Sequence, residues 1–535
     1  MMAKTRTLTV LLLKGEGSGA DDFIKPDEVG DRVLDRRELE VGTEILFLFI
    51  LKTSAQPPRW ADFFRNHLTP YELGSVSTAS AALLLRVAGS WLAVTFGQGR
   101  HLIRPEAIVE DFGLRVTLNA VGKGSLRSID KETFDAIANH SRLQSSREAD
   151  AGEFGLDVER DLLRAVTGTP RDPNLAQRLS GMDALAITIE VDLAGLSELL
   201  HKLIQVFADE SYRTNFPWVD NIRSVKDLGD MNDLDAALFA TVGRGDFSNT
   251  WLAPPEILNW ASVRVFSYSD ASNPRVFTDI HWRTLLRNHR GDFSRDALKR
   301  KRVFCYGEDR KIIRDWALYN CIYAETDFKG SSYILSNGRW YRIAANLEEE
   351  VNDWFSSFPK VESALPVYDH DSERLYNEDV ARHSSGHFAL LDRKLVNYGG
   401  GQSSIEFCDL LGLDGEIVHV KRYSGSRELS HLFMQGLVSC QLFLEDPHFR
   451  DALKKVVPAL HWEECRLADG KASGRRITFA VIYRSRGEFV LPFFSRITLR
   501  QTSRRLVSYE CSPCLSRIRM DEVRAYREKY KDEAF

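Results

Sequence analysis

The first 130 residues alternate short apolar runs with clusters of glycine, proline and aspartate. The runs are rich in β-branched and aromatic residues, a pattern typical of strands separated by turns. The predicted strands are Thr7–Leu13, Glu44–Leu51, Ala81–Val87, Trp91–Phe96 and Leu114–Leu118. Even the most apolar run is far shorter than the roughly 20 residues needed to span a bilayer. The pattern therefore predicts a β-rich N-terminal domain over 1–130 and no membrane span.

From residue 131 the spacing of apolar residues becomes mainly helical. Between 193 and 207, leucine, isoleucine and phenylalanine recur every three or four residues, as on one face of a helix. Two further helices, one strand and one hairpin are predicted at 279–289, 345–358, 263–268 and 333–343. Pro359 follows the last of these helices and marks a boundary. We expect a mainly helical middle domain over 131–358 and a separate domain over 359–535.

The last domain has the most regular pattern. Its predicted elements are a helix at 372–383, strands at 388–396, 405–411 and 416–423, a helix at 427–444, a strand at 477–484 and a helix at 494–507. Helical spacing and alternating apolar runs separate the two types of element. The order begins α-β-β-β-α-β. The fold class is therefore predicted as multidomain α+β.

Candidate chemistry gathers on the hairpin of this domain. Asp409 ends one apolar run, and His419-Val420-Lys421 ends the next. Because side chains alternate along a strand, His419 and Lys421 point to the same side and can meet Asp409. Glu378, on the preceding helix, is the predicted additional acid, and Glu406 is the second choice. Carboxylates bind Mg²⁺, and a lysine beside them orients water or neutralises phosphate charge.

This hairpin and element order resemble the PD-(D/E)xK nuclease superfamily, which implies an αβββαβ restriction-endonuclease-like core; whether that core is intact or degenerate stays open. Such nucleases normally carry Asp or Glu where His419 stands. The predicted metal ligands are Asp409 and His419. Because His419 would supply a nitrogen ligand, we expect the site to favour Mn²⁺ over Mg²⁺. The alternatives are an ion pair between Asp409 and Lys421, an Asp409 cap on the hairpin, and a hydrogen-bonded core role for His419.

Composition limits the remaining function classes. The chain has 535 residues, 43% of them hydrophobic, and a formal net charge of −5. These values are typical of a globular protein with about three domains, and any nucleic-acid surface must be local. Seven sparse cysteines are typical of a reduced cytoplasm, and the lone motif Cys511-Ser-Pro-Cys514 lacks the second pair of a zinc site. With no secretory signal pattern at the start, we expect a cytoplasmic protein.

Two segments are strongly basic. Residues 283–314 hold eleven Lys/Arg against four acids, and residues 471–519 hold eleven against two. Aromatic residues are interleaved with them, which favours a phosphate-facing surface over plain solvation. The predicted nucleic-acid-binding residues are Arg283, Arg287, Arg290, Arg300, Lys301, Arg302, Arg475, Arg476, Arg484, Arg500 and Arg504.

Nearly the whole chain resembles a sporadically distributed bacterial family of unknown function, found near restriction–modification and antiphage defence genes. The resemblance is carried by Thr95–Gly99, Phe112–Asn119, Trp218–Asn221, Tyr333–Ile343, Ile405–Leu410, His419–Lys421, Leu429–Phe433, Gln435-Gly436 and Leu491–Phe494. It implies a defence setting and includes His419 in the family's own pattern. It implies no settled activity.

Together these observations predict an antiphage defence protein that binds DNA, phage DNA included, and cleaves it with Mn²⁺ or Mg²⁺ in its C-terminal domain. Two alternatives remain open. The first is a catalytically inactive effector that blocks phage replication or transcription by binding alone. The second is a toxin-like enzyme or sensor that acts on a protein or a small molecule. Partner defence proteins and a homo-oligomer fit each of them.

Overall fold

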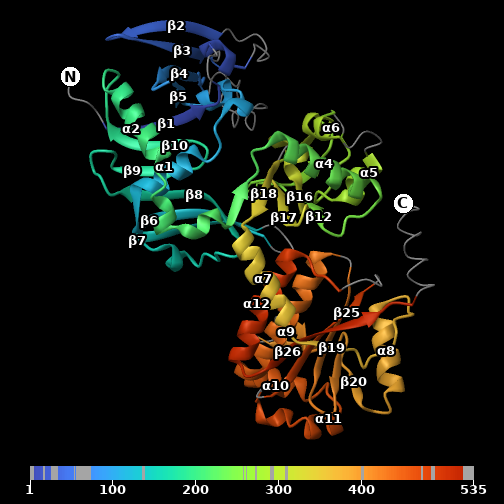
Figure 1. Cartoon of the computed structure of the whole chain (residues 1–535). Helices are drawn as coiled ribbons and strands as arrows, with labels where there is room; N and C mark the ends of the chain where they lie inside the picture. The colour runs from blue at the N-terminus through green and yellow to red at the C-terminus, as the bar shows by residue number, and fades with distance from the viewer. Residues whose placement is uncertain are drawn as a thin grey trace. The chain divides into compact units, whose positions relative to one another are not determined.

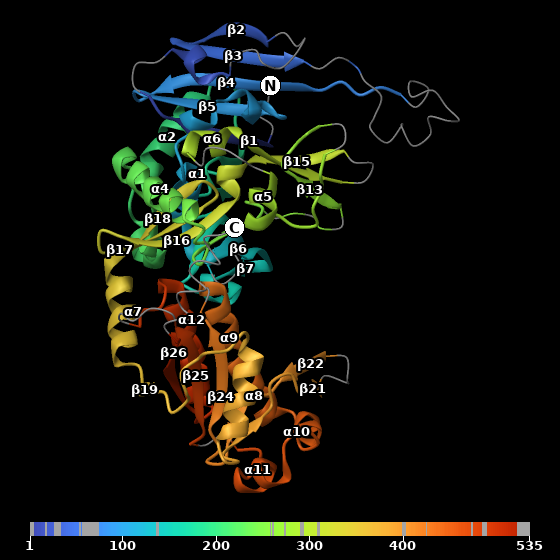
Figure 2. The same ribbon diagram turned by 90° about the vertical axis from the view of Figure 1, so that its right-hand side faces the viewer.

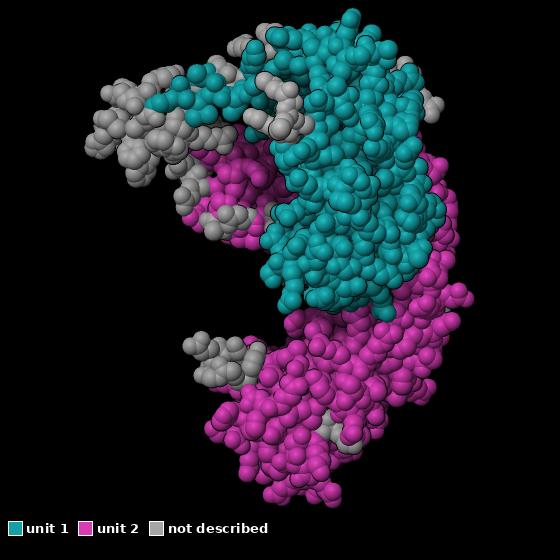
Figure 3. Space-filling model, turned by 90° about the vertical axis from the view of Figure 1, so that its left-hand side faces the viewer, with its two compact units in different colours: residues 1–132, 141–220 teal, residues 133–140, 221–535 magenta. Residues whose placement is uncertain are grey.

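The computed structural model divides into two compact units, residues 1–132 with 141–220 and residues 133–140 with 221–535 (Figure 3). The three-domain division stays a prediction. The residues described are 5–15, 19–25, 34–52, 55, 74–134, 139–256, 258, 260, 262–271, 274–288, 294–307, 311–398, 403–423, 425–471, 474–483 and 489–521. Helices and antiparallel sheets both occur, so the predicted α+β class is confirmed.

The first unit is built on a ten-stranded sheet with the order β2-β3-β4-β5-β1-β10-β9-β8-β6-β7. β1 is central and antiparallel to both neighbours, so Val10 lies opposite Val94 on one side and Leu185 on the other. The strands are β1 (Thr5–Leu13), β2 (Leu34–Val41), β3 (Glu44–Lys52), β4 (Ala79–Val87), β5 (Ser90–Phe96), β6 (Val121–Thr133), β7 (Asn139–Ala149), β8 (Asp161–Pro170), β9 (Arg178–Gly181) and β10 (Leu185–Glu190). The helices are α1 (Phe112–Ala120), α2 (Leu196–Ala208) and α3 (Tyr212–Asn215).

Four of the five strands predicted in the first 130 residues are confirmed as β1, β3, β4 and β5. The prediction of a strand at Leu114–Leu118 is wrong, because these residues lie in α1. Phe112 and Val116 pack into one core cluster and Leu114 and Leu118 into another, the spacing of a helix buried on two sides. A short run that is apolar all round has no alternation from which to distinguish strand from helix.

The helical prediction from residue 131 is wrong up to residue 190, where β6 to β10 lie, and it is confirmed for α2. β6 and β7 are largely polar and half-exposed, so their sequence lacks the apolar alternation of a typical strand. Ion pairs between strands hold them instead. Asp130 of β6 pairs with Arg142 of β7, and Lys131 of β6 lies 2.6 Å from Asp161 of β8.

The second unit begins with two small sheets, ordered β11-β18-β17-β16-β12 and β13-β14-β15. The predicted helices at 279–289 and 345–358, the strand at 263–268 and the hairpin at 333–343 are confirmed as α5, α7, β13 and β17–β18. The strands are β11 (Ile222–Ser224), β12 (Thr250–Leu252), β13 (Val265–Ser267), β14 (Arg302–Tyr306), β15 (Ile312–Ala317), β16 (Ile322–Phe328), β17 (Ser331–Ser336) and β18 (Arg339–Ile343). The helices are α4 (Leu228–Gly243), α5 (Trp282–Asn288), α6 (Arg295–Arg300) and α7 (Ala345–Ser357).

The same unit continues into a six-stranded mixed sheet with the order β19-β26-β25-β24-β23-β20. β19, β26, β25 and β24 are parallel, whereas β23 and β20 run antiparallel to their neighbours. The strands are β19 (Lys360–Glu362), β20 (Phe388–Leu390), β23 (Leu410–Gly412), β24 (Ile417–Arg422), β25 (Arg476–Tyr483) and β26 (Ser512–Arg519), with a separate ribbon of β21 (Leu395–Tyr398) and β22 (Ser403–Glu406). The helices are α8 (Glu373–His383), α9 (Ser426–Glu445), α10 (Pro447–Leu453), α11 (Ala459–Glu464) and α12 (Phe493–Ser508).

α8 covers one face of this sheet, and α9 and α12 cover the other (Figures 1 and 2). Val418 and Val420 of β24 pack with the α8 residue Tyr376, whereas Ile417 packs with Leu432 of α9. Along the chain, α8, β20, β23, β24, α9 and β25 follow one another in the predicted order, but the ribbon β21–β22 lies between β20 and β23, and α10 and α11 lie between α9 and β25. The predicted strands 388–396 and 405–411 are each split in two, because a turn follows Leu391 and the chain leaves the sheet before Leu410. No helix among the described residues is long and apolar enough to cross a bilayer.

Candidate metal centre

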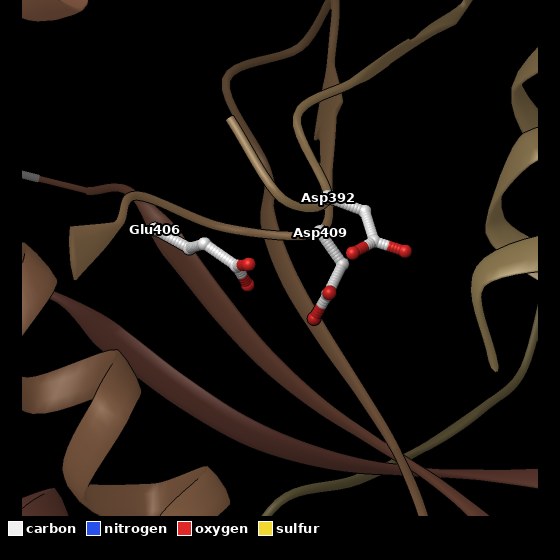
Figure 4. Close-up of side chains that lie close together, drawn as sticks. All are labelled: Asp392, Glu406 and Asp409. Carbon is white, nitrogen blue, oxygen red and sulfur yellow. The ribbon is translucent and has the colours of Figure 1, made fainter. Parts of the chain in front are cut away.

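Three carboxylates meet at the two breaks in the predicted strands. Asp392 lies in the turn after β20, Glu406 ends β22, and Asp409 immediately precedes β23. Their oxygens lie within 4.8 Å of one another, and Figure 4 shows the three side chains gathered around one common space. Two oxygens on opposite sides of a divalent cation are about 4–5 Å apart. The spacing of the cluster therefore fits one cation.

Asp409 is buried and fixed by the backbone of β24. Its Oδ2 accepts a hydrogen bond of 2.7 Å from the Val420 N–H, and its own carbonyl oxygen accepts from the N–H groups of Leu391 and Asp392. Burial raises the pKa of this carboxyl to about 8. The Val420 N–H opposes the shift, and the neighbouring carboxylates of Asp392, Glu406 and Glu373 add to it. In the absence of a cation, Asp409 is therefore largely protonated at neutral pH.

Asp392 is placed by a tight turn. The Lys394 N–H donates to the Leu391 carbonyl oxygen at 3.0 Å, and Arg393 has the left-handed backbone angle φ of +61°. Few non-glycine residues adopt this conformation. The turn brings the Asp392 N–H onto the Asp409 carbonyl oxygen at 3.1 Å. A backbone contact therefore ties the first carboxylate of the cluster to the third.

Glu406 comes from the separate ribbon and reaches the cluster from another side (Figure 4). Burial and the Asp392 carboxylate raise the pKa of Glu406, and hydrogen bonds from the Arg393 N–H and Gln435, together with the positive charge of Lys421, partly offset that rise. Gln435 of α9 lies 3.4 Å from its Oε2 through Nε2. Two members of the cluster therefore have raised pKa values, as expected where negative charges crowd in a low-dielectric site.

Asn377 of α8 lies behind two of the carboxylates and is fully buried. Its Nδ2 donates to Asp392 Oδ2 at 3.1 Å and lies 3.5 Å from Asp409 Oδ1. Among the described residues its Oδ1 has no hydrogen-bond partner. Buried amide oxygens are rarely left without a partner. A water molecule bound to a metal ion in the cluster would donate the missing hydrogen bond to Asn377 Oδ1.

Lys421 is held at the end of β24 by an acid on α8 that the sequence analysis did not select. Glu373 Oε2 lies 3.1 Å from Lys421 Nζ, and Glu373 Oε1 accepts from the Arg422 N–H at 2.9 Å. The predicted acid Glu378 instead forms an ion pair of 2.7 Å with Arg374 of its own helix, and it does not belong to the three-carboxylate cluster.

His419 has a different environment from the one predicted. It is fully buried, its ring stacks on Phe479 at 6.2 Å, and its Cδ2 lies against Gly436 of α9. Neither ring nitrogen has a hydrogen-bond partner among the described residues, and burial lowers the pKa of His419 to about 4. The ring is neutral at physiological pH and is not part of the cluster. Of the predicted metal ligands, only Asp409 lies in it.

The predicted nucleic-acid residues have mixed environments. Arg300 and Arg504 are exposed. Arg302 pairs with Asp315, and Arg476 lies 3.7 Å from Asp414. Burial lowers the pKa of Lys301. Arg290 and Arg484 lie outside the described residues, as do the side chains of Arg283 and Arg287.

Two other predicted surface arginines point inward. Arg500 is only 3% exposed, and Arg475 donates to the carbonyl oxygens of Lys471 and Cys465 at 2.7 Å each. The guanidinium of Arg475 also lies 5.5 Å from the centre of the Phe443 ring. The surface prediction is therefore wrong for Arg500, and Arg475 has structural partners that hold its guanidinium within the fold.

Asp392, Asn377 and Glu373 are residues near this site that were not predicted from the sequence. A signal for Asp392 was present, because it follows an apolar run directly, as Asp409 does. Glu373 follows the N-cap serine of α8, where an acid is common for reasons of helix stability alone. Its sequence position therefore gave no separate indication of a role near Lys421.

Comparison with known proteins gives one finding. Residues 8–519 match the model of a family described as a family of unknown function, DUF6119. Neither the curated proteins nor the solved structures give a match. The expected membership in a family of unknown function is confirmed over most of the chain, whereas the expected genomic setting stays a prediction. The chain belongs to the DUF6119 family.

Proposed function

We propose that this protein binds DNA and cleaves it at a divalent-metal site formed by Asp392, Glu406 and Asp409, with Lys421 beside them, and that it acts in antiphage defence. The observation that carries the proposal is the convergence of three carboxylates at the end of a mixed sheet, next to a lysine. The defence role rests on the family resemblance alone. The order α8-β20-β23-β24-α9-β25 supports the comparison with the PD-(D/E)xK nuclease core.

The residues present fit Mg²⁺ or Mn²⁺. All three donors are carboxylate oxygens, which hard divalent cations prefer. Burial, with a smaller contribution from repulsion between the carboxylates, raises the pKa values of Asp409 and Glu406 and so disfavours their charged forms. A bound cation would supply positive charge and a Lewis acid that activates water and steadies phosphate. Because the nitrogens of His419 lie outside the cluster, we no longer expect a nitrogen ligand or a strong preference for Mn²⁺.

The protein's own side chains would divide the remaining work. Glu373 holds the Lys421 ammonium group beside the carboxylates, where it can contact a phosphate oxygen. Asn377 keeps Asp392 and Asp409 together and leaves an amide oxygen to accept a hydrogen bond from water. The Val420 N–H fixes the direction of the Asp409 carboxylate. Each of these contacts fixes the position of a functional group, and none of them has to change during a reaction.

Binding without cleavage remains the second candidate. One observation favours it: His419 occupies the strand position where a related nuclease would carry a carboxylate, and its ring is packed against Phe479. A protein with this change could keep the fold and lose the chemistry. Exposed arginines such as Arg300 and Arg504 would then supply phosphate contacts, and affinity for DNA would fall steeply with salt.

The test uses labelled duplex and single-stranded DNA with the full chain, in Mg²⁺, in Mn²⁺ and in chelator. We expect cleavage with either cation and none in chelator. Glu406→Gln and Asp392→Asn should each lower the cleavage rate by at least about 100-fold. Glu463→Gln, an exposed acid on α11, is the matched control and should cleave as the wild type does.

Binding is measured on the same samples from 50 to 300 mM salt. Salt-sensitive binding that survives Glu406→Gln, with no cleavage in any sample, would select the binding-only candidate. Absence of both binding and cleavage would overturn the nucleic-acid proposal. Thermal melting of each variant shows whether the loss of activity comes from unfolding.

A further inference from the structure

A pair of cysteine thiols lies far apart in the sequence but in contact in the fold. Cys440 of α9 and Cys511, in the segment between α12 and β26, have their sulfur atoms 3.2 Å apart, and both side chains are buried. Cys511 is also close in sequence to Cys514, in the motif Cys511-Ser-Pro-Cys514. In the structure Cys514 instead lies 3.2 Å from the Thr478 hydroxyl, so Cys511 is matched with Cys440.

The surroundings of this pair hold it in place. The Cys511 N–H donates to the Leu506 carbonyl oxygen at 3.0 Å, which fixes the chain directly after α12. Cys440 lies on the inner side of α9, within the core cluster that also contains Leu506 and Phe443. A disulfide bond is about 2.0 Å long. The two sulfurs therefore need to approach by only a little more than about 1 Å to be bonded.

A fixed positive charge lies beside the thiols. The Arg475 guanidinium, held by the carbonyl oxygens of Lys471 and Cys465, acts electrostatically on both sulfurs. The hydrogen bond between the thiols, together with Arg475, lowers the pKa of Cys511, and the same hydrogen bond raises the pKa of Cys440. A cation beside a thiol favours the thiolate, which is the reactive form of cysteine.

We propose that Cys440 and Cys511 form a reversible intramolecular disulfide when the protein meets a peroxide, and that this bond clamps α9 to the segment that leads into β26. Cys511 is the attacking thiol. Its thiol releases a proton, and the thiolate attacks one peroxide oxygen, so that the O–O bond breaks and the sulfenic acid of Cys511 is formed. The other oxygen leaves as hydroxide and takes up the released proton to become water. Cys440 then attacks the Cys511 sulfur and expels hydroxide, which takes up the Cys440 proton as water.

The balance of this sequence is complete. Two thiols lose two hydrogen atoms and two electrons, one hydrogen peroxide molecule is reduced to two water molecules, and one S–S bond is formed. A dithiol reductant reverses the change. The proposal does not depend on metal binding or DNA cleavage, since neither cysteine belongs to the carboxylate cluster.

The experiment exposes the full chain to hydrogen peroxide and then blocks free thiols under denaturing conditions. Peptide mapping without reductant should find one cross-link, between the peptides that contain Cys440 and Cys511, with a mass about 2 Da below their sum. Dithiothreitol should remove it. Cys514→Ser and Cys465→Ser are matched controls that should keep the cross-link, because neither sulfur belongs to the pair.

Assignment of the attacking thiol needs two more variants and a sulfenic-acid probe. Cys440→Ala should accumulate the sulfenic acid at Cys511, whereas Cys511→Ala should leave Cys440 unmodified. A Cys511–Cys514 bond in the wild type would overturn the pairing. Unreacted Cys440 and Cys511, at a peroxide dose that oxidises an exposed thiol peptide in the same tube, would overturn the proposal. The wild-type cross-link decides the pairing even if a variant fails to fold.

Discussion

Replacing Asp409 with asparagine isolates the energetic cost of ionising this buried carboxyl group. The pKa of Asp409 is raised from an ordinary 3.8 to about 8. The unfolded chain therefore releases this proton near pH 4, while the folded protein keeps it up to about pH 8. Between these values the folded state binds more protons than the unfolded state, so stability falls as pH rises. Each pH unit is worth ~1.4 kcal/mol, which makes the whole window worth up to ~6 kcal/mol.

Asparagine mimics the protonated carboxyl, since its Oδ1 can accept the Val420 N–H and its amide can donate to a neighbouring carboxylate. In chelator we expect Asp409→Asn to match the wild type near pH 4.5 and to become more stable as pH rises. At pH 8 its advantage should reach about 2–4 kcal/mol, since relaxation reduces the full value. A saturating divalent cation should reverse the order, because the wild type alone keeps all three ligands.

The assay is scanning calorimetry of both proteins from pH 4.5 to 8.5, in chelator and in Mn²⁺, with Glu463→Gln as the exposed-acid control. A chain with two compact units need not unfold in one step. The free energies of unfolding are therefore compared for the unfolding transition whose midpoint temperature changes with the substitution. A stability difference between Asp409→Asn and the wild type that stays the same across this pH range would refute the reasoning. It would mean that the carboxyl is ionised in the folded protein.

Four further predictions concern individual contacts. Because the pKa of His419 is lowered to about 4, His419 contributes a stability loss of up to about 3 kcal/mol as pH falls from 6.5 to 4, opposite in sign to the contribution of Asp409. In the same calorimetric series, His419→Leu should therefore gain stability relative to the wild type as pH falls from 6.5 to 4.5. His419→Glu should lower the melting temperature by several degrees with or without a cation; an unchanged melting temperature with new cation binding would restore the metal-ligand role. Glu325 Oε1 accepts a hydrogen bond of 3.0 Å from the Phe494 N–H in the first turn of α12. In urea unfolding, Glu325→Ala should lower the free energy of unfolding by about 1–3 kcal/mol, and Glu325→Gln by about 1 kcal/mol or less. Equal losses in the two variants would exclude a capping role for Glu325. A Cβ at Gly436 would lie 2.6 Å from Phe479 Cε1, so Gly436→Ala should cost about 1–3 kcal/mol, while Gly243→Ala, which meets no atom within 4 Å, should leave stability almost unchanged.

The sequence allowed good prediction where one face of an element is apolar and the period is clear. α9 and α12 lie where helical spacing predicts them, and the α-β-β-β-α-β order follows from alternating elements of ordinary length. β6 and β7 were missed because polar strands held by ion pairs lack that signal. The breaks after Leu391 and before Leu410 were missed because each depends on contacts between segments distant in sequence.

The incorrect choice of Glu378 on α8 shows how hard it is to predict from the sequence which face of a helix is buried. Helical spacing of apolar residues predicts that Leu375, Tyr376 and Val380 lie on one side of α8, but Leu375 is 37% exposed, and the buried residues are Tyr376, Asn377 and Val380. Neighbouring residues on a helix are about 100° apart. A small error in the buried face therefore led to Glu378, whereas Asn377 and Glu373 are the residues that reach the site.

The basic residues show a different limit. Counting charges along the chain treats every arginine as a surface cation. Arg500 is almost fully buried, and Arg475 is held by two carbonyl oxygens within the fold. An arginine side chain is long enough to pack its stem in the core while its guanidinium meets internal acceptors. The three-dimensional environment alone distinguishes these residues from Arg300 and Arg504, which are exposed.

The most direct test of the proposed metal centre is Mn²⁺ binding to the full chain at pH 8, followed by calorimetry and by the electron paramagnetic resonance signal of free Mn²⁺. We predict saturable binding with proton release from Asp409, a loss of affinity of at least about tenfold in Glu406→Gln and in Asp392→Asn, and unchanged affinity in Glu463→Gln. Absence of saturable binding, or equal affinity in the wild type and both cluster variants, would contradict the assignment of Asp392, Glu406 and Asp409 as a metal centre.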